Sequence, residues 1–427
     1  MTVLHFIKNL DKNNLSGLFM NDLLKGGIDK TTTHILTMSV NDNMEDLMKH
    51  ATVYRLSRKI WSARANWLKL ESIVKSIRPD IIHIHSLGGF DAWMIFKFAQ
   101  KERIPIVISP YKELMDWNFH NKYLRRKLPL LCFFQHDMLK EAAAIHCVSE
   151  QEQEGIHTVS WCPGLKAKDA INANSCLVQY AKETESGVDT NRVVEQMGIF
   201  YRKVADSNPF MLMSGDDRKM ESDLLALGVS LIKTDGNMDK IFLPVEDIKK
   251  RAEELSDEKW RLIQLHSESQ GILQLVLRAM DILVPGKIHI DITAIERFGH
   301  HQEIAFLETT RAHIRVSRIR QLCDTYSHDD VEKKICIMML NLKYLADKNI
   351  LTRKNIVDVY AVLRFETYNE YLLENMLDEI GMKKYAQRVL KILQDSMGLE
   401  DGFAAMALRH DRTQRRIENN LFKSNIQ

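Results

Sequence analysis

The sequence predicts an α/β protein: a doubly wound parallel sheet, then a small α/β segment and a mainly α-helical carboxyl region. Through about the first 160 residues, short β-rich runs alternate with helix-length amphipathic runs, which is the pattern of parallel strands joined by crossover helices. After Glu246, apolar residues recur instead at three- and four-residue spacing. The 427 residues, 45% of them apolar, suffice for two or three hydrophobic cores.

Six strands are expected in the first part, each a short apolar run. They are Val3–Ile7, His34–Met38, Thr52–Leu56, Ile81–His85, Ile106–Ser109 and Ala144–Val148. The helices expected between them are Leu18–Leu24, Ile60–Ile77, Phe90–Gln100 and Leu124–Ala143. Pro79 marks the end of one helix, because proline disfavours the helical conformation in the residue before it.

Four segments divide the chain. Residues 1–160 are expected to form the sheet domain, 161–191 a linker interrupted by Pro163 and Gly164, 192–300 a small mixed α/β region, and 301–427 a helical region. The strands expected beyond the linker are Phe210–Ser214, Ser230–Lys233 and Ile288–Ile292. The helices expected there are Lys219–Leu227, Val245–Glu254, Asp257–Ala279, Gln302–Tyr326, Asp329–Asp347, Thr352–Ile380 and Lys383–Met397.

Composition excludes several classes of protein. Lysine plus arginine number 59 and aspartate plus glutamate 57, so no excess of positive charge indicates a nucleic-acid partner. The six cysteines form no C-x-x-C pair, which excludes a zinc ribbon or disulfide scaffold and favours buried thiols in a reducing compartment. No apolar run approaches the roughly 20 residues of a membrane-spanning helix. We therefore expect a cytoplasmic protein, at most peripheral to the inner face of the membrane.

Ligands of doubly wound sheets bind beyond the carboxyl ends of the strands, so the residues there are the candidate site. Ser16 and Gly17 follow the first strand and begin a helix, where backbone N–H groups could meet a ligand; a serine cap with a packing glycine is the structural alternative. His83 and His85 share one face of a strand that ends before Ser86. They supply too few ligands for a metal, so no metal site is expected.

The next strand ends before Tyr111 and Lys112, and Asp116 follows shortly after. This loop places a phenol, an ammonium group and carboxylates beyond one strand end. Together with the neighbouring loops it forms a colinear series of motifs: PDIIHIHS, ISPYKELMDWNF and LKEAAAIHCVSEQEQEGI.

That series resembles the amino-terminal domain of family 4 retaining glycosyltransferases, and the resemblance covers about 160 residues. It implies a Rossmann-like domain of the GT-B type that holds the acceptor. A nucleotide-sugar is then the second substrate, with no cofactor or metal required. The implied function is sugar transfer to a saccharide or lipid-linked acceptor in cell-surface polysaccharide or capsule biosynthesis.

The resemblance also assigns roles to residues. His85 and Tyr111 fall at the catalytic positions. The positions implied to bind substrate are Ser16, Gly17, Ser86, Lys112, Asp116 and Lys122. A membrane surface, met through the basic tail from Arg409 to Arg416, and a protein bound by the helical carboxyl half are the further partners that the sequence allows.

Two departures from the family favour an alternative function. Tyr111 replaces a histidine, and a phenol with a pKa near 10 shuttles protons poorly at neutral pH. The family's paired glutamates of the carboxyl domain have no match in register after Glu296. The alternative is a catalytically inactive relative that acts as a binding or scaffold protein.

Overall fold

The computed structural model divides the chain into two compact units, treated separately below. The sheet unit comprises Met1–Leu212 and Glu296–Phe298, and the helical unit comprises Met213–Ile295 and Gly299–Ile426. The residues that the structure describes are 1–44, 49–59, 62–111, 113, 135–158, 174–180, 189–238, 241, 243–298, 310–326, 330–348 and 350–421. None of the described helices combines the length and apolarity needed to cross a lipid bilayer.

The sheet unit is built on seven strands in the order β3-β2-β1-β4-β5-β6-β7, with every neighbouring pair parallel. The strands are β1 (Thr2–Leu10), β2 (Thr32–Val40), β3 (Thr52–Arg55), β4 (Ile81–Ile84), β5 (Ile106–Ile108), β6 (Ala144–Cys147) and β7 (Ser175–Leu177). The strand order reverses between β1 and β4, so the connections that follow these two strands diverge toward opposite faces of the sheet. Ligands of doubly wound sheets bind at such a point, beyond the carboxyl ends of the strands.

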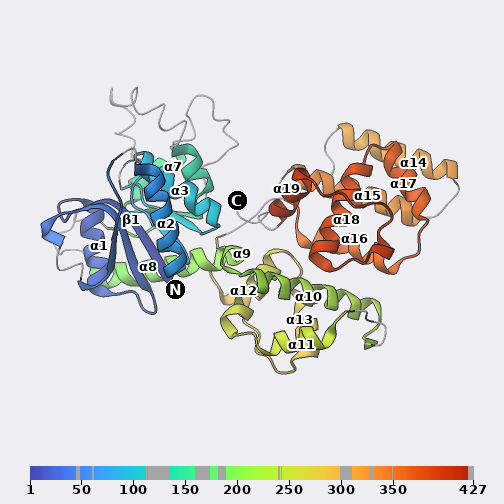
Figure 1. Ribbon diagram of the computed structural model, residues 1–427, viewed down its shortest axis with the longest axis horizontal. Helices are drawn as coiled ribbons and strands as arrows, with labels where there is room; N and C mark the ends of the chain where they lie inside the picture. The colour runs from blue at the N-terminus through green and yellow to red at the C-terminus, as the bar shows by residue number, and fades with distance from the viewer. Residues whose placement is uncertain are drawn as a thin grey trace. The chain divides into compact units, whose positions relative to one another are not determined.

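Helices cover both faces of this sheet (Figure 1). They are α1 (Leu15–Gly26), α2 (Ala63–Ile77), α3 (Phe90–Glu102), α6 (His136–Glu141), α7 (Glu150–Thr158), α8 (Thr190–Ser207) and α9 (Pro209–Leu212), with a 3₁₀ turn at Asp42–Met44. One core joins Leu4 and Phe6 of β1 to α2 and α3, and a second joins Val3 and Ile7 to α1 and α8. Because successive side chains of a strand alternate, His5 points with Val3 and Ile7 toward α1 and α8.

The doubly wound parallel sheet and the helical carboxyl region are both confirmed. The six expected strands are present. The structure adds β7, which lies within the segment expected to be a linker, and α8, whose Met197 and Phe200 complete the core beside α1. Of the helix expected at 124–143, residues 135–143 are described, and α6 accounts for His136–Glu141.

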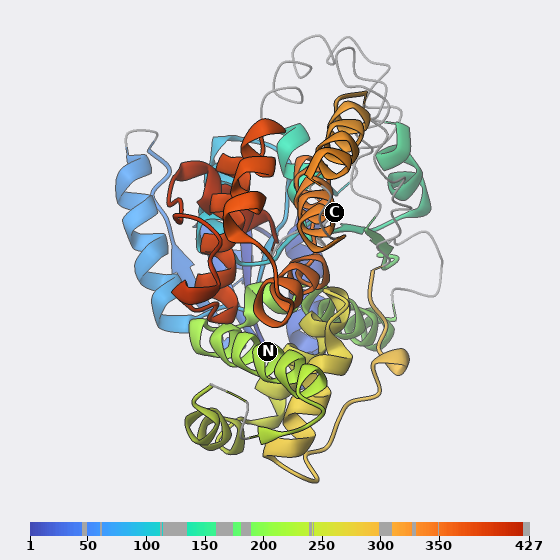
Figure 2. The same cartoon turned by 90° about the vertical axis from the view of Figure 1, so that its right-hand side faces the viewer.

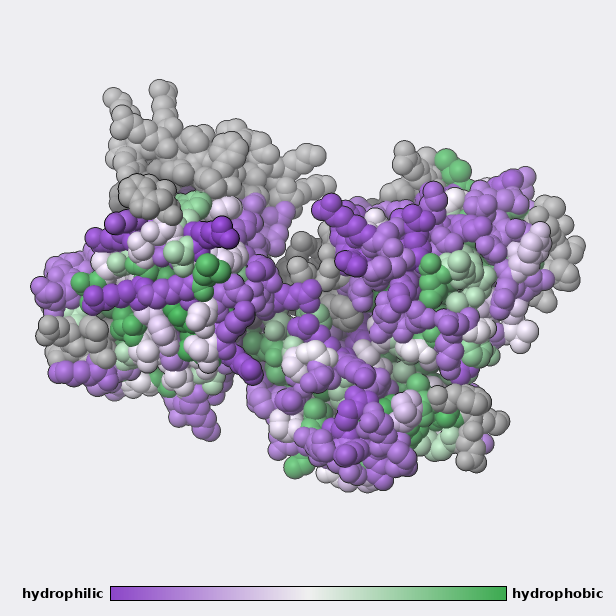
Figure 3. Space-filling view, viewed as in Figure 1, coloured by the Kyte–Doolittle hydropathy of each residue, from purple (hydrophilic) through white to green (hydrophobic). Residues whose placement is uncertain are grey.

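The described part of the helical unit contains α10 to α19 and two 3₁₀ turns, Ile292–Ala294 and Asp401–Phe403, and no strand. The helices are α10 (Gly215–Lys233), α11 (Val245–Glu253), α12 (Asp257–Ser269), α13 (Leu273–Leu283), α14 (Thr310–Tyr326), α15 (Asp330–Asp347), α16 (Arg353–Phe365), α17 (Glu370–Glu379), α18 (Lys383–Met397) and α19 (Arg412–Leu421). Helices α10 and α13 pack together (Figures 1 and 2), and Gly228 permits their approach, since a Cβ there would lie 2.2 Å from the Leu275 carbonyl oxygen. Hydrophilic residues make up most of the face of this unit shown in Figure 3.

The three strands expected between residues 210 and 292 are wrong. Ser214 begins α10 instead of ending a strand, because it forms a capping box with Asp217. Ser230–Lys233 continues α10, and the Ser230 hydroxyl donates to the Ala226 carbonyl one turn earlier. Ile288–Ile292 alternates like a strand but has no partner strand among the described residues, and Ile288 is 84% exposed. The described part of 192–300 is therefore helical, not mixed α/β.

Two long helices expected in this unit are each divided in the structure. Gly271, with a φ of +69°, separates α12 from α13, because this left-handed conformation ends a helix. A turn before Glu370 likewise separates α16 from α17.

A buried ionic network ties three helices of this unit together. The Glu221 carboxylate of α10 accepts hydrogen bonds from His266 Nδ1 (2.8 Å) and Ser267 Oγ (2.7 Å) of α12. Arg353 Nη1 of α16 donates to the same carboxylate at 2.6 Å, and all four side chains are at most 3% exposed. Burial by itself would raise the pKa of Glu221, but His266 and Arg353 hold it at about 2.

Candidate functional site

The connection from β1 to α1 supplies the first part of the candidate site. Asp11 shapes it: its carboxylate accepts from the Asn13 backbone N–H (2.9 Å) and from Asn43 Nδ2 (2.8 Å), which lowers the pKa of this carboxyl. Gly17 is required because a Cβ there would lie 2.0 Å from the Asp11 carbonyl oxygen. Ser16 lies partly exposed in the first turn of α1, whose N-cap residue, Asn14, makes no side-chain capping bond. The positive end of α1 is thus not neutralised by its cap.

The connection from β4 to α3 supplies the second part. Ser86 Oγ donates to Glu113 Oε1 (3.1 Å) and accepts from the Gly88 backbone N–H (2.8 Å). The Leu87 backbone N–H also donates to Glu113, at 3.3 Å. Gly89 has a φ of +100°, a conformation that side chains other than hydrogen disfavour. The Ser86 hydroxyl therefore fixes the shape of this loop and reaches the loop after β5 through Glu113.

Three of the expected binding residues, Lys112, Asp116 and Lys122, lie outside the described residues. Tyr111 and Glu113 are the described residues of that loop.

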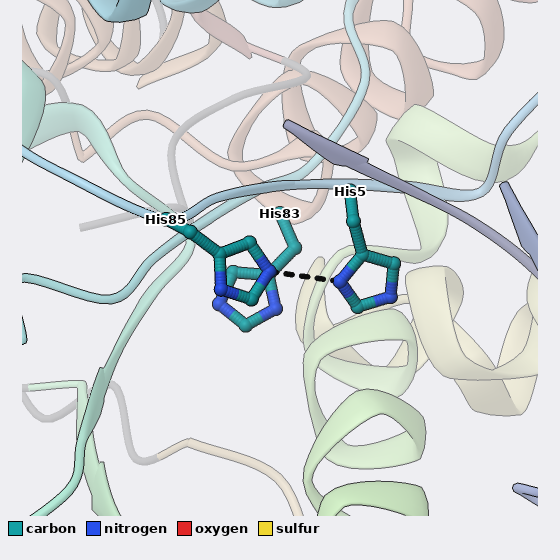
Figure 4. A group of neighbouring side chains, drawn as sticks. All are labelled: His5, His83 and His85. Carbon is teal, nitrogen blue, oxygen red and sulfur yellow. Dashed lines mark hydrogen bonds between the residues drawn. The ribbon is translucent and has the colours of Figure 1, made fainter. Parts of the chain in front are cut away.

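Histidines of the two central strands meet on the α1 and α8 side of the sheet. His5 of β1 and His83 of β4 are direct neighbours in the parallel register. Figure 4 shows their rings beside that of His85, with His5 Nδ1 hydrogen-bonded to His85 Nε2 at 2.9 Å. His85 Nδ1 is in turn 2.7 Å from the Tyr111 hydroxyl. A chain of three hydrogen-bonding side chains thus leads from the core to Tyr111 at the carboxyl edge of β5.

A second chain of polar groups runs beside the first. The Tyr201 hydroxyl of α8 lies 2.6 Å from His83 Nδ1, and His83 Nε2 lies 2.7 Å from Ser109 Oγ. Ser109 Oγ also lies 2.6 Å from His146 Nδ1. Since a hydroxyl donates one hydrogen, Ser109 donates to one imidazole and accepts from the other. The chain therefore fixes the tautomers of His83 and His146 together.

Burial keeps all four imidazoles neutral. It lowers the pKa of His5 to about 3 and that of His146 to about 4. The pKa values of His83 and His85 are held well below the usual histidine value by burial and by the neighbouring imidazoles. His85 is 4% exposed. At neutral pH these histidines can orient a neighbour, but none is a ready source of a proton.

Tyr111 is the member of the network nearest to solvent. It is partly exposed, and its ring stacks on that of His85 at 5.6 Å between centroids. Its φ of +48° is unusual for a residue with a side chain, so the surrounding contacts hold the backbone in a strained conformation. Desolvation, together with the neighbouring Tyr201, raises its pKa well above the usual tyrosine value. The phenol stays protonated and can serve as a hydrogen-bond donor.

His5, His83 and His85 also form a group whose potential ligand nitrogens lie within 4.8 Å of one another. A metal ion would have to displace hydrogen bonds, because both nitrogens of His83 and both of His85 already have partners. No carboxylate belongs to this group, so the charge of a divalent ion would be buried uncompensated. The arrangement suits a neutral hydrogen-bonded network better than a metal centre.

Sequence reasoning placed His83, His85 and Tyr111 near one another but missed His5, His146 and Tyr201. Each of the missed residues is a lone polar side chain within an apolar run, which indicates no more than a buried residue. The register between β1 and β4 brings His5 to the site, and α8 brings Tyr201.

Comparison with known protein families gives one match to this unit. The family model described as Glycosyl transferase 4-like domain matches residues 48–163, a range that includes β3 to β6 and the loops carrying His85, Ser86 and Tyr111. Searches of curated proteins and of solved structures found no match. Residues 48–163 are thus similar to a glycosyl transferase 4-like domain, and the doubly wound parallel sheet agrees with that match.

Proposed function

We propose that the protein is a glycosyltransferase that moves a sugar from a nucleotide-sugar to a saccharide or lipid-linked acceptor in cell-surface polysaccharide or capsule synthesis. The observation that carries this proposal is the family match over the strands whose carboxyl ends hold the site. The acceptor binds at that edge, between the connections that follow β1 and β4. The nucleotide-sugar is a substrate, and no further cofactor is invoked.

Tyr111 is the residue that we assign to the acceptor. When its hydroxyl donates to an acceptor oxygen, its own oxygen can accept from His85 Nδ1, and His85 Nε2 can then accept from His5 Nδ1. This direction of hydrogen bonding suits neutral histidines. His85 thus acts through Tyr111 by fixing where the phenol points.

The remaining residues of the edge complete the acceptor site. Backbone N–H groups at Ser16 and Gly17 can approach an anionic or hydroxyl oxygen, because no side chain caps α1. Ser86 shapes its loop, and Lys112, Asp116 and Lys122 are assigned to acceptor hydroxyls or phosphate.

A second function is favoured by the helical unit. A second Rossmann-like domain would hold the nucleotide-sugar in family 4 enzymes, yet the described residues of this unit contain no strand. A binding or scaffold protein that retains only an acceptor-side domain would need no such second domain, which agrees with the helical character of the described residues of this unit. Its helical half then docks a protein partner.

The chain is further proposed to be cytoplasmic and to touch the inner face of the membrane. Supporting this, Arg412, Arg415 and Arg416 are exposed on α19, where anionic headgroups could meet them.

Sugar transfer by the purified full chain distinguishes the two functions. The chain is incubated with radiolabelled nucleotide-sugars and with saccharide or polyprenyl phosphate acceptors, and both transfer and donor hydrolysis are followed. We expect transfer by the wild type and a loss of about 10- to 100-fold in the Tyr111→Phe variant, which keeps the ring but loses the donor.

Tyr201→Phe is the matched control. It also removes a hydroxyl bonded to a histidine Nδ1, but Tyr201 is fully buried, so its loss should lower stability and leave transfer within a few-fold. A folded wild-type chain that neither transfers the sugar nor hydrolyses the donor would support the scaffold function instead.

A further inference from the structure

An exposed arginine is held at the carboxyl edge of the sheet by two neutral side chains. Arg58, in the connection from β3 to α2, donates through Nη2 to Asn9 Oδ1 at 2.8 Å and to Ser39 Oγ. Ser39 Oγ also donates to Asn9 Oδ1 at 2.9 Å. Asn9 and Ser39 are direct neighbours in the register of β1 and β2, near the ends of both strands. The guanidinium is therefore fixed beside the carboxyl ends of β1 and β2 instead of extending freely into solvent.

These contacts leave the charge of Arg58 uncompensated. Among the described residues no carboxylate forms an ion pair with it, and its Nε and Nη1 groups make no hydrogen bond there. A guanidinium has five N–H donors in a planar fork, and this fork matches the oxygens of a phosphate or a carboxylate. The free part of the fork is thus available to an anion.

The surrounding segment reinforces the charge. From Thr52 to Leu70 the chain carries five basic residues and no acidic one. Arg55 and Lys59 of this segment are exposed close to Arg58 in the sequence. Such a segment lowers the energy of an anion at the end of the sheet.

We propose that Arg58, positioned by Asn9 and Ser39, binds an oxyanion of the acceptor, so that the acceptor is a phosphorylated or acidic sugar. The identification of the ligand as the acceptor rests on the proposed function. The binding of an anion by Arg58 does not depend on it. Two sources carry this chemistry: the diphosphate of a polyprenyl-linked sugar and the carboxylate of a uronic acid.

Direct binding tests the site without requiring turnover. Calorimetry measures the affinity of the full chain for a short-chain polyprenyl diphosphate sugar, for a glucuronate disaccharide and for a neutral disaccharide of the same size. We expect one of the two anionic probes to bind more tightly than the neutral one, and the probe that binds identifies the source. The Arg58→Gln variant should weaken that binding about 10- to 100-fold.

Two further variants distinguish an anion bound by Arg58 from a general attraction of anions to the basic segment. Arg64→Gln removes an exposed arginine of the same basic segment that Asn9 and Ser39 do not hold, and it should leave affinity within about twofold. Asn9→Asp keeps the shape but places a carboxylate on Arg58, so it should weaken binding as much as Arg58→Gln does.

Equal binding by wild type and Arg58→Gln, or no preference for either anionic probe, would overturn the inference. Equal losses in Arg58→Gln and Arg64→Gln would overturn it as well. Transfer to a neutral acceptor that Arg58→Gln leaves intact would refute the anion site and retain the glycosyltransferase. Arg58-dependent binding without any transfer would retain the site and refute the enzyme.

Discussion

Each unit of the molecule buries a network of polar side chains, but the network of the sheet unit is neutral whereas that of the helical unit is ionic. In the sheet unit, four imidazoles are linked by tyrosine and serine hydroxyls, and no carboxylate hydrogen-bonds to these rings among the described residues. In the helical unit, the Glu221 carboxylate is bound by Arg353, His266 and Ser267. The first network is stable only while it stays uncharged, and the second only while both ionic partners are present.

Acidification should produce the largest difference in stability between the two networks. Unfolded chains protonate histidine below pH about 6.5, whereas folded His5 and His146 resist until about 3 and 4. The stability that these groups contribute is therefore complete above pH 6.5 and declines as the pH falls below it. At pH 5 keeping His5 neutral costs about 2 kcal/mol, and keeping His146 neutral costs a similar amount.

Hydrogen exchange of the full chain at pH 7 and pH 5, corrected for intrinsic rates, measures each unit separately. The sheet unit should lose protection first, because Glu221, with a pKa of about 2, stays ionised over this range and its stabilising effect declines only below about 4.5. Equal protection of the sheet unit at both pH values would contradict a neutral network.

Removing one ionic partner should be the next largest effect. Arg353→Met leaves the Glu221 carboxylate buried without its guanidinium, which should cost about 3 to 5 kcal/mol in urea unfolding. Glu221→Gln combined with Arg353→Met should recover part of the loss, because no buried charge then remains. A change below about 1 kcal/mol in the single variant would show that the charges are already screened.

Each unit also has a glycine in the first turn of a helix, Gly17 in α1 and Gly215 in α10, and the two glycines differ in the space around them. In the sheet unit, Gly17→Ala places a Cβ 2.0 Å from the Asp11 carbonyl oxygen, so we expect a loss of about 1 to 3 kcal/mol and weaker acceptor binding. In the helical unit, Gly215→Ala meets nothing within 4 Å in the first turn of α10 and should be neutral or slightly stabilising. Similar thermal midpoints for the two variants would argue against the close approach at Gly17.

Removing one neutral partner should cost less than removing one ionic partner. Tyr201→Phe takes one hydroxyl from His83 Nδ1 and leaves no charge behind, so we expect a loss of about 1 to 2 kcal/mol. Urea unfolding measures the loss, and ¹⁵N NMR of the His83 ring reports the tautomer. A loss of stability as large as that of Arg353→Met would contradict the distinction between a neutral network and an ionic one.

The parallel sheet could be predicted because its strands are buried on both faces and read as near-continuous apolar runs, as in Ile106–Ile108. The same signal fails for short runs elsewhere. Ser230–Lys233 has an apolar centre, Leu231 and Ile232, but belongs to a helix of 19 residues. Four residues cannot reveal whether a helical or a strand period continues. The three-residue strand β7 was missed for the opposite reason: its side chains are only partly buried.

The candidate site was predictable in part for a related reason. His83 and His85 are two residues apart, so a local pattern places them on one face. The partners of these residues come from pairing between distant segments: His5 through the β1 and β4 register, and Tyr201 from α8, 118 residues beyond His83. Arg58 was missed as one of many exposed cations, since only the contacts with Asn9 and Ser39 distinguish it.

Locating the acceptor tests the central claim most directly. Hydrogen exchange of the full chain is measured with and without a polyprenyl diphosphate-linked disaccharide and a uronic-acid disaccharide. We expect one of them to protect backbone amides after β1, in residues 11–17, and after β4, in residues 85–89, with no change around Glu221. Protection confined to the helical unit, with these two connections unchanged, would contradict an acceptor site at the edge of the sheet.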